Sequence, residues 1–158
     1  MVISLFIYLL CLVCWLGGMI FFSIFTAPVI FSALPITEAG KVVAGIFPRY
    51  YLLGYIAGVI AALLALYMAI WWGPRLWWSL ATAALIAAVA LTFYAGMVVR
   101  PNIDSIRAVV EEQAPDPLRK AEFDRLHRLS VALNGGAMLL NLLALLSTAA
   151  ALAPHVSA

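Results

Sequence analysis

Few residues in this chain could do chemistry, and four of them recur at a fixed interval near its C-terminal end. His127, Asn134, Asn141 and Thr148 are spaced seven residues apart. Seven residues make two helical turns less about 20°, so these side chains point to one face of a helix. Ser130 and two alanines fill the row three residues further on. We call this narrow, neutral, hydrogen-bonding face the polar stripe.

Two interpretations of the polar stripe stay open. Asparagine amides commonly form hydrogen bonds between membrane helices, which would make the stripe a packing seam. Alternatively, Asn134, Asn141 and Tyr94 could line a polar path or ligand cavity with His127 at its mouth. Arg49 and Arg128 could then hold an anionic ligand below the bundle, although arginines that anchor lipid headgroups are the simpler alternative.

A second candidate is the pair Cys11 and Cys14, three residues apart within an apolar run. Thiolates on one helical face would suit a soft metal such as Cu(I). No basic residue lies nearby to favour the reactive thiolate, and a thiol in apolar surroundings usually behaves as a small hydrophobe. The pair is therefore only a weak metal-site candidate, and the sequence leaves any cofactor unknown.

Motifs of the common enzyme classes are absent from the sequence. It contains no HExxH, no GxSxG and no Walker loop, and no pair of carboxylates falls where a cavity is expected. We therefore expect a protein that is not an enzyme and has no catalytic residues.

The composition predicts that the chain lies in a membrane. Of 158 residues, 66% are hydrophobic and 10% are charged, whereas soluble domains contain roughly 45–50% apolar residues. The mean hydropathy is +1.10. We expect an integral membrane protein whose main partner is the lipid bilayer. The net charge of +2, with no basic patch, argues against nucleic acid.

Four apolar segments predict an all-α, integral membrane four-helix bundle that forms one domain over residues 1–158. The expected spans are residues 2–27, 51–72, 76–99 and 129–153. Gly73-Pro74 joins the second and third spans as an antiparallel hairpin, flanked by tryptophans typical of the membrane interface. Gly54 and Gly58 form a small-xxx-small pair that predicts close helix approach.

Prolines predict where these helices break. Pro28 should kink or end the first span near residue 27, and Pro48 should stop a short interfacial helix over residues 37–47. Arg100-Pro101 should end the third span before a soluble loop over residues 100–128. That loop should carry a short helix at about residues 103–113.

The fourth helix should be long. Asp116 is a good N-cap, and Pro117 suits the first helical position. From there to about residue 153 only Gly135-Gly136 interrupts the apolar pattern. We expect about 37 residues and about 55 Å of helix at 1.5 Å per residue, so the first turns extend into the cytoplasm.

The charge distribution predicts an orientation. Lys41, Arg49 and six basic residues in 100–128 fall on one side, against Arg75 alone on the other. The positive-inside rule then places residues 28–50 and 100–128 in the cytoplasm and both termini outside, in what we expect to be a bacterial inner membrane.

Short motifs along the chain carry a resemblance. They are WLGGMIFF (15–22), Ala27-Pro28, Leu34-Pro35, Ala39-Gly40, FPRYY (47–51), RPNID (100–104) and LHRLSVALN (126–134). Over about residues 10–143 the sequence resembles the transmembrane-protein-205-like family. That resemblance implies a four-span membrane protein with no settled activity, and it gives the two cysteines no role.

Three functions remain open at this point. The first is transport or permeation of a small molecule or ion, or ligand binding within the bundle. The second is a structural or assembly subunit that binds a partner through the cytoplasmic loop and the long fourth helix. A second copy of the chain or another membrane protein is a possible partner. The third is a metal- or haem-associated membrane protein.

Overall fold

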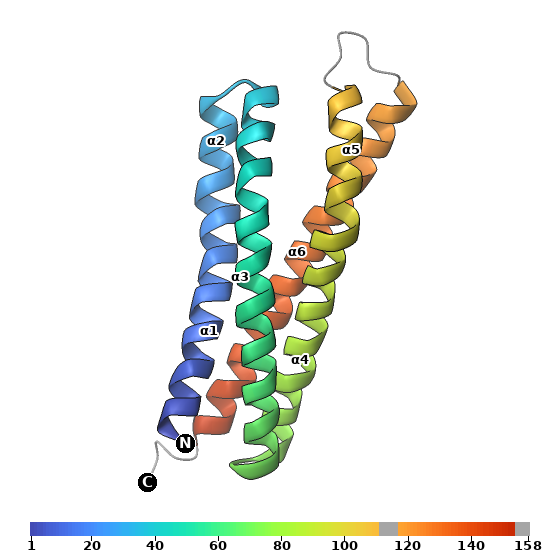
Figure 1. Cartoon of the computed structure of the whole chain (residues 1–158). Coiled ribbons are helices and arrows are strands. Elements are labelled where there is room, and N and C mark those ends of the chain that lie inside the picture. The colour runs from blue at the N-terminus through green and yellow to red at the C-terminus, as the bar shows by residue number, and fades with distance from the viewer. Residues whose placement is uncertain (111–116, 154–158) are drawn as a thin grey trace.

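The structure is a computed structural model that describes residues 1–110 and 117–153. In chain order its elements are α1 (Val2–Ile20), the π-helical segment η1 (Phe21–Thr26), α2 (Ala27–Ala33), α3 (Ile36–Trp71), α4 (Arg75–Tyr94), the π-helical segment η2 (Ala95–Val99), α5 (Arg100–Val110) and α6 (Pro117–Leu152). α1, η1 and α2 follow one another without a break, as do α4, η2 and α5. The described residues thus form four long helical rods (Figure 1), which confirms the predicted all-α four-helix class.

Each rod is long and apolar enough to cross a membrane. The longest, α3 and α6, have 36 residues each and are about 54 Å long at about 1.5 Å per residue. A hydrocarbon core of about 30 Å leaves the rest of each helix outside it. The chain is an integral membrane protein, and α3 and α6 are longer than the hydrocarbon core is thick.

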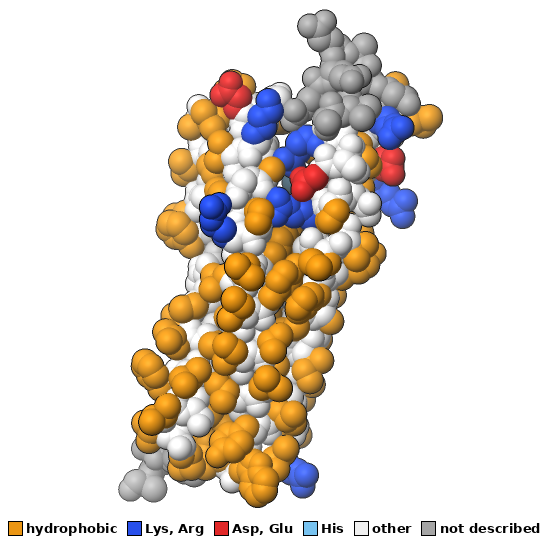
Figure 2. All heavy atoms as spheres, in the orientation of Figure 1, with side chains coloured by type: hydrophobic (Ala, Val, Ile, Leu, Met, Phe, Trp, Pro, Cys, Tyr) orange, Lys and Arg blue, Asp and Glu red, His pale blue; other side chains and the backbone are white. Residues whose placement is uncertain are grey.

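The two ends of the bundle differ in chemistry. Figure 1 places the N-terminus and the α3–α4 turn at one end, and the α2–α3 connection with the adjoining ends of α5 and α6 at the other. Charged side chains gather at that second end, over a band that is almost entirely hydrophobic (Figure 2). We call it the charged end. The described parts of residues 28–50 and 100–128 thus lie at one end of the bundle, as predicted (Figure 1).

Neither the first nor the third span ends at the proline where the sequence allowed an end. The first rod passes Pro28 and ends at Ala33, and the third passes Pro101 and continues to Val110. In both places a π-helical turn precedes the proline. There the backbone N–H groups of Ala27 and Arg100 donate to the carbonyls five residues earlier, those of Phe22 and Ala95. A widened turn of this kind lets a helix continue where a proline lacks its N–H group.

The short interfacial helix over residues 37–47 is also wrong as a separate element. α3 runs from Ile36 to Trp71 with Pro48 in its interior, and Thr37 makes no capping hydrogen bond. Likewise, most of the predicted soluble loop over 100–128 is helix, in α5 and the first turns of α6. Pro117 does begin the fourth helix, whereas Asp116 and Gln113 lie outside the described residues.

Glycines bring three rods together in the middle of the bundle. The Trp15 indole of α1 lies against Gly54 and Gly58 of α3, which leave no room for a Cβ atom beside it. This confirms the predicted close approach. The tryptophans near the α3–α4 turn do not all lie at the surface, as an interfacial belt would require. Trp71 is exposed, whereas Trp78 is buried, with its ring centroid 5.5 Å from that of Tyr8.

Candidate functional site

The polar stripe of α6 faces the interior of the bundle, where Thr148 and Asn134 bond to other helices. The Thr148 hydroxyl donates to the Ala144 carbonyl at 2.7 Å and lies 2.7 Å from the Tyr8 hydroxyl of α1. The Asn134 Oδ1 accepts a hydrogen bond from Tyr50 at 3.1 Å, and its Nδ2 donates to the Tyr51 hydroxyl at 3.3 Å. These contacts tie α6 to α1 and α3.

Asn141, between these two, is fully buried but only half paired. Its Nδ2 donates to the Ala137 carbonyl at 2.9 Å and lies 4.0 Å from the Met19 sulfur of α1. Its Oδ1 has no hydrogen-bond partner among the described residues. From Asn134 to Thr148 the stripe consists of packed and bonded side chains, as the packing-seam interpretation expects.

His127, at one end of the stripe, and the candidates outside the stripe do not gather around these bonded residues. Ser130 is buried on α6, but His127 is exposed and its ring lies parallel to that of Phe123, 6.3 Å away. Tyr94 is 48% exposed. Arg49 is exposed, and its one hydrogen bond to a described residue goes to the Gly45 carbonyl of its own helix, at 3.5 Å.

Cys11 and Cys14 are free thiols on α1, the first partly buried and the second exposed. Over residues 1–110 and 117–153, no three side chains of the His, Cys, Asp and Glu types gather where they could hold a metal ion. The structure therefore adds no ligand to this weak candidate.

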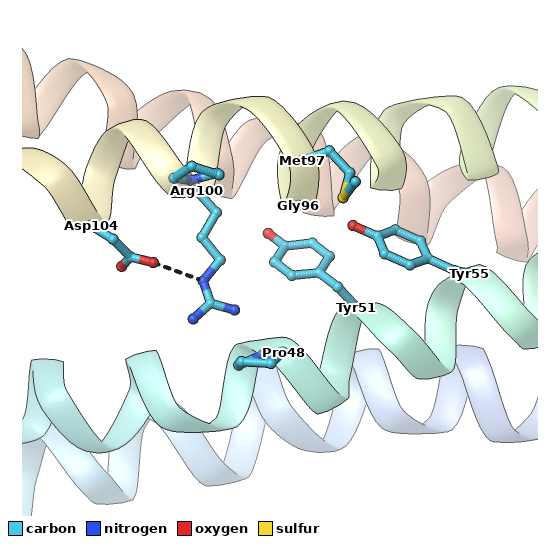
Figure 3. A pocket seen from close by; sticks show the side chains of 8 residues that line it. Pro48, Tyr51, Tyr55, Gly96, Met97, Arg100 and Asp104 are labelled. Atoms are coloured by element: carbon cyan, nitrogen blue, oxygen red, sulfur yellow. Dashed lines mark hydrogen bonds and ion pairs between the residues drawn. The ribbon is translucent and has the colours of Figure 1, made fainter.

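A pocket of about 530 Å³ lies elsewhere, between α3 and the η2–α5 segment. Figure 3 shows the side chains that surround it. Its lining residues are Pro48, Tyr51, Tyr55, Gly96, Met97, Arg100, Pro101 and Asp104. None of the site residues predicted from sequence is among them. Asn134 contacts the pocket indirectly, through its bond to Tyr51.

One part of the pocket is aromatic. Tyr51 and Tyr55, one turn apart on α3, have roughly parallel rings with centroids 6.2 Å apart, and Tyr55 stacks on Phe93 at 4.2 Å. Gly96 permits this arrangement because a Cβ atom there would collide with the Tyr55 hydroxyl and with the Tyr51 ring. The absence of a side chain at residue 96 thus keeps both rings against the third rod.

The other part of the pocket is charged. Arg100 extends from α5 toward α3 (Figure 3), with its Nε 3.3 Å from the Asp104 carboxylate and its guanidinium carbon 5.4 Å from the centre of the Phe47 ring. Its Nη2 donates to the Ala44 carbonyl of α3 at 2.6 Å. Two turns further along α5, Arg107 donates in the same manner to the Gly40 carbonyl at 2.9 Å.

The bond from Arg100 has a specific local cause. In an α-helix, the Ala44 carbonyl would accept the N–H of residue 48, but residue 48 is proline and has no N–H. A carbonyl without a donor is costly wherever water is scarce. Arg100 supplies the missing donor from another helix, and this is how α3 continues through Pro48 without the π-helical turn that precedes Pro28 and Pro101.

Sequence reasoning missed this site for an identifiable reason. FPRYY and RPNID count in the sequence only as motifs of the family resemblance, and Arg100 counts there as the end of a span. One available signal was the i,i+4 spacing of Arg100 with Asp104 and of Tyr51 with Tyr55, which places each pair on one helical face. What joins the two pairs is the packing of α3 against η2 and α5.

Two leucine substitutions on the polar stripe should have different effects. Asn134→Leu removes the partner of Tyr50 and Tyr51 and should lower the free energy of unfolding by about 1–2 kcal/mol. Asn141→Leu removes an amide whose oxygen is already unpaired, so the change should be close to neutral or stabilising. Thermal or SDS-induced unfolding of both variants in detergent measures this difference. Equal losses in the two variants would contradict the hydrogen bonding described above.

Comparison with known proteins gives one match. The family model described as "Domain of unknown function (DUF4149)" matches residues 10–112, more than half of the chain. All eight lining residues of the pocket fall within that segment, whereas the polar stripe of α6 lies outside it. No curated protein and no solved structure matches the chain. The resemblance to the transmembrane-protein-205-like family finds no support in these comparisons.

Proposed function

Since the chain belongs to the DUF4149 family, whose function is unknown, we propose its function from the pocket: it binds an amphiphilic molecule at the boundary of the membrane. The observation that carries this proposal is the division of a single pocket into an aromatic part and a charged part. The proposal narrows the functions expected from sequence to ligand binding within the bundle.

The depth of the pocket supports a ligand that is partly in lipid. α3 from Tyr51 to the α3–α4 turn is about 30 Å long at about 1.5 Å per residue, which matches the hydrocarbon thickness. Tyr51 therefore lies near the boundary, with Tyr55 on the lipid side of it. Arg100 and Asp104 lie on the side of the charged end, where water and headgroups are available.

The lining chemistry supports an amphiphile over a purely polar solute. The tyrosine rings and Met97 offer apolar area to a hydrocarbon chain, and Arg100 with Asp104 offers hydrogen bonds to a polar group. A volume of about 530 Å³ is within the usual range for small-molecule sites. Permeation along the polar stripe has less support because its side chains are bonded to neighbouring helices.

We further propose that the charged end is cytoplasmic and that both termini are outside, because eight of the nine basic residues lie at that end. We propose in addition that the protein resides in a bacterial inner membrane and that it has no catalytic role. Its partner there is a second copy of the chain or another membrane protein. Cysteine accessibility at residue 75 and at residue 119, measured in intact cells, tests the orientation.

Photolabelling tests the binding proposal. In proteoliposomes, a fatty acid carrying a photoreactive diazirine should label the segments around Tyr55 and Met97, and excess unlabelled fatty acid should suppress that label. Met97→Trp should reduce the label several-fold, because the indole would occupy pocket volume. Mass spectrometry of the labelled peptides measures both effects.

The matched control is Val98→Trp, which places the same ring one residue further along η2 at an exposed position that does not line the pocket. It should leave the competable label unchanged. Label that spreads over the lipid-facing residues without saturation, or that Met97→Trp does not reduce, would contradict the proposal.

A further inference from the structure

The charged part of the pocket presents both signs of charge. Arg100 and Asp104 both line it, one helical turn apart on α5, and their side chains are 15% and 43% exposed. Figure 3 shows them at the same end of the pocket, away from Tyr55. A ligand group that enters this end therefore meets a cation and an anion together.

Arg100 keeps hydrogen-bonding capacity after its structural contacts are made. Nε donates to Asp104 and Nη2 to the Ala44 carbonyl, while Nη1 has no bonding partner among the described residues. The neutral Ala44 carbonyl leaves the guanidinium charge in place. Because the Ala44 bond and the Phe47 ring already hold the guanidinium, a ligand does not have to order it.

Asp104 likewise uses one of its two carboxylate oxygens within the described structure. Its Oδ2 accepts from Arg100, and its Oδ1 makes no hydrogen bond to any residue that the structure describes. An anionic headgroup on Arg100 would be repelled by this carboxylate, and a cationic one on Asp104 would be repelled by the guanidinium. A headgroup that carries both charges can pair with both residues, so that each of its charges lies next to a residue of opposite sign.

On this basis, which rests on the proposed function, we propose that the pocket binds a zwitterionic lipid headgroup in which a phosphate is joined to a primary ammonium. The phosphate oxygens accept from the free edge of Arg100, and arginine forms such bonds with good geometry. The ammonium donates to Oδ1 of Asp104. A quaternary ammonium has no N–H to donate, so a choline headgroup loses this bond, and a phosphoglycerol headgroup offers no cation to Asp104.

The proposal is tested by binding three phospholipids with identical acyl chains to the full chain in detergent, measured by native mass spectrometry. The ethanolamine lipid should bind about tenfold more tightly than the choline and glycerol lipids, since one charge-assisted hydrogen bond separates them. Asp104→Asn should remove that preference, and the variant should bind the glycerol lipid as tightly as the natural chain does or more tightly. Soluble phosphoethanolamine should compete only at far higher concentration, because it lacks the hydrocarbon that faces the tyrosines.

Two arginine variants complete the experiment. Arg100→Gln should weaken all three lipids, whereas Arg107→Gln, on the same helix and outside the pocket, should weaken none. Asp104→Asn keeps the test decisive even where Arg100→Gln folds poorly, because the exposed Asp104 side chain has one hydrogen bond among the described residues, to Arg100.

Tightest binding of the glycerol lipid, or equal binding of all three, would overturn the headgroup assignment. Competition by soluble phosphoethanolamine at the same concentration as the lipid would show that the bound headgroup does not have to belong to a lipid. If Met97→Trp still removes the bound lipid in these cases, the amphiphile pocket stands. If no lipid binds saturably, the proposed function fails as well.

Discussion

Replacing Arg100 with methionine should lower the free energy of unfolding by about 2–3 kcal/mol in the natural chain, but by about 1 kcal/mol or less when Pro48 is alanine. The reason is the Ala44 carbonyl, which receives its hydrogen bond from Arg100 because Pro48 has no N–H. Alanine at residue 48 restores the helical donor, so the guanidinium is no longer required there. Reversible unfolding of the two single variants and the double variant gives the coupling energy.

Arg107 provides the matched control for this cycle. It also donates from α5 to an α3 carbonyl, that of Gly40, but the helical donor for this carbonyl is Ala44, which has its N–H. Arg107→Met should therefore be additive with Pro48→Ala. The loss of the Asp104 and Phe47 contacts occurs in both backgrounds and cancels. A coupling energy near zero for Arg100 would refute the role of its guanidinium as a replacement donor.

The second large effect should come from Gly58, where adding one methyl group is expected to destabilise the bundle by about 1–3 kcal/mol. A Cβ atom at residue 58 would lie 2.7 Å from both the Trp15 ring and a Val89 methyl group. Trp15 is 3% exposed and packed between rods, so it has little room to move. Gly58→Ala should therefore push α1 and α4 away from α3.

Gly17→Ala is the control, because residue 17 is also a helical glycine but has nothing within 4 Å of the added atom. It should be neutral or slightly stabilising, since alanine favours helix over glycine by about 1 kcal/mol. Trp15→Phe should recover part of the loss in the Gly58→Ala background by shrinking the opposing ring. Unfolding midpoints in one detergent measure all four proteins. Equal midpoints for the two alanine variants would rule out the tight contact.

Hydropathy was sufficient for the class of fold because lipid leaves the backbone few choices. Where no water can satisfy N–H and C=O groups, an apolar segment must form a helix, so the four helices and the end at which each connection lies could be predicted. The direction of the polar stripe was predictable for a similar reason. A seven-residue interval keeps Asn134, Asn141 and Thr148 on one face whatever that face contacts.

The helix breaks and the pocket depended on contacts between distant segments. A proline removes a donor, but whether the helix ends there depends on whether a widened turn or another helix makes up for it. For Pro48 that donor is Arg100, fifty-two residues later in the chain. Likewise, Tyr51 and Tyr55 form a wall only because Gly96 of the third rod admits them. Local pattern therefore decided that the four apolar segments are helical and which way the polar stripe faces. The packing of α3 against η2 and α5 decided how far the helices continue and where a ligand can bind.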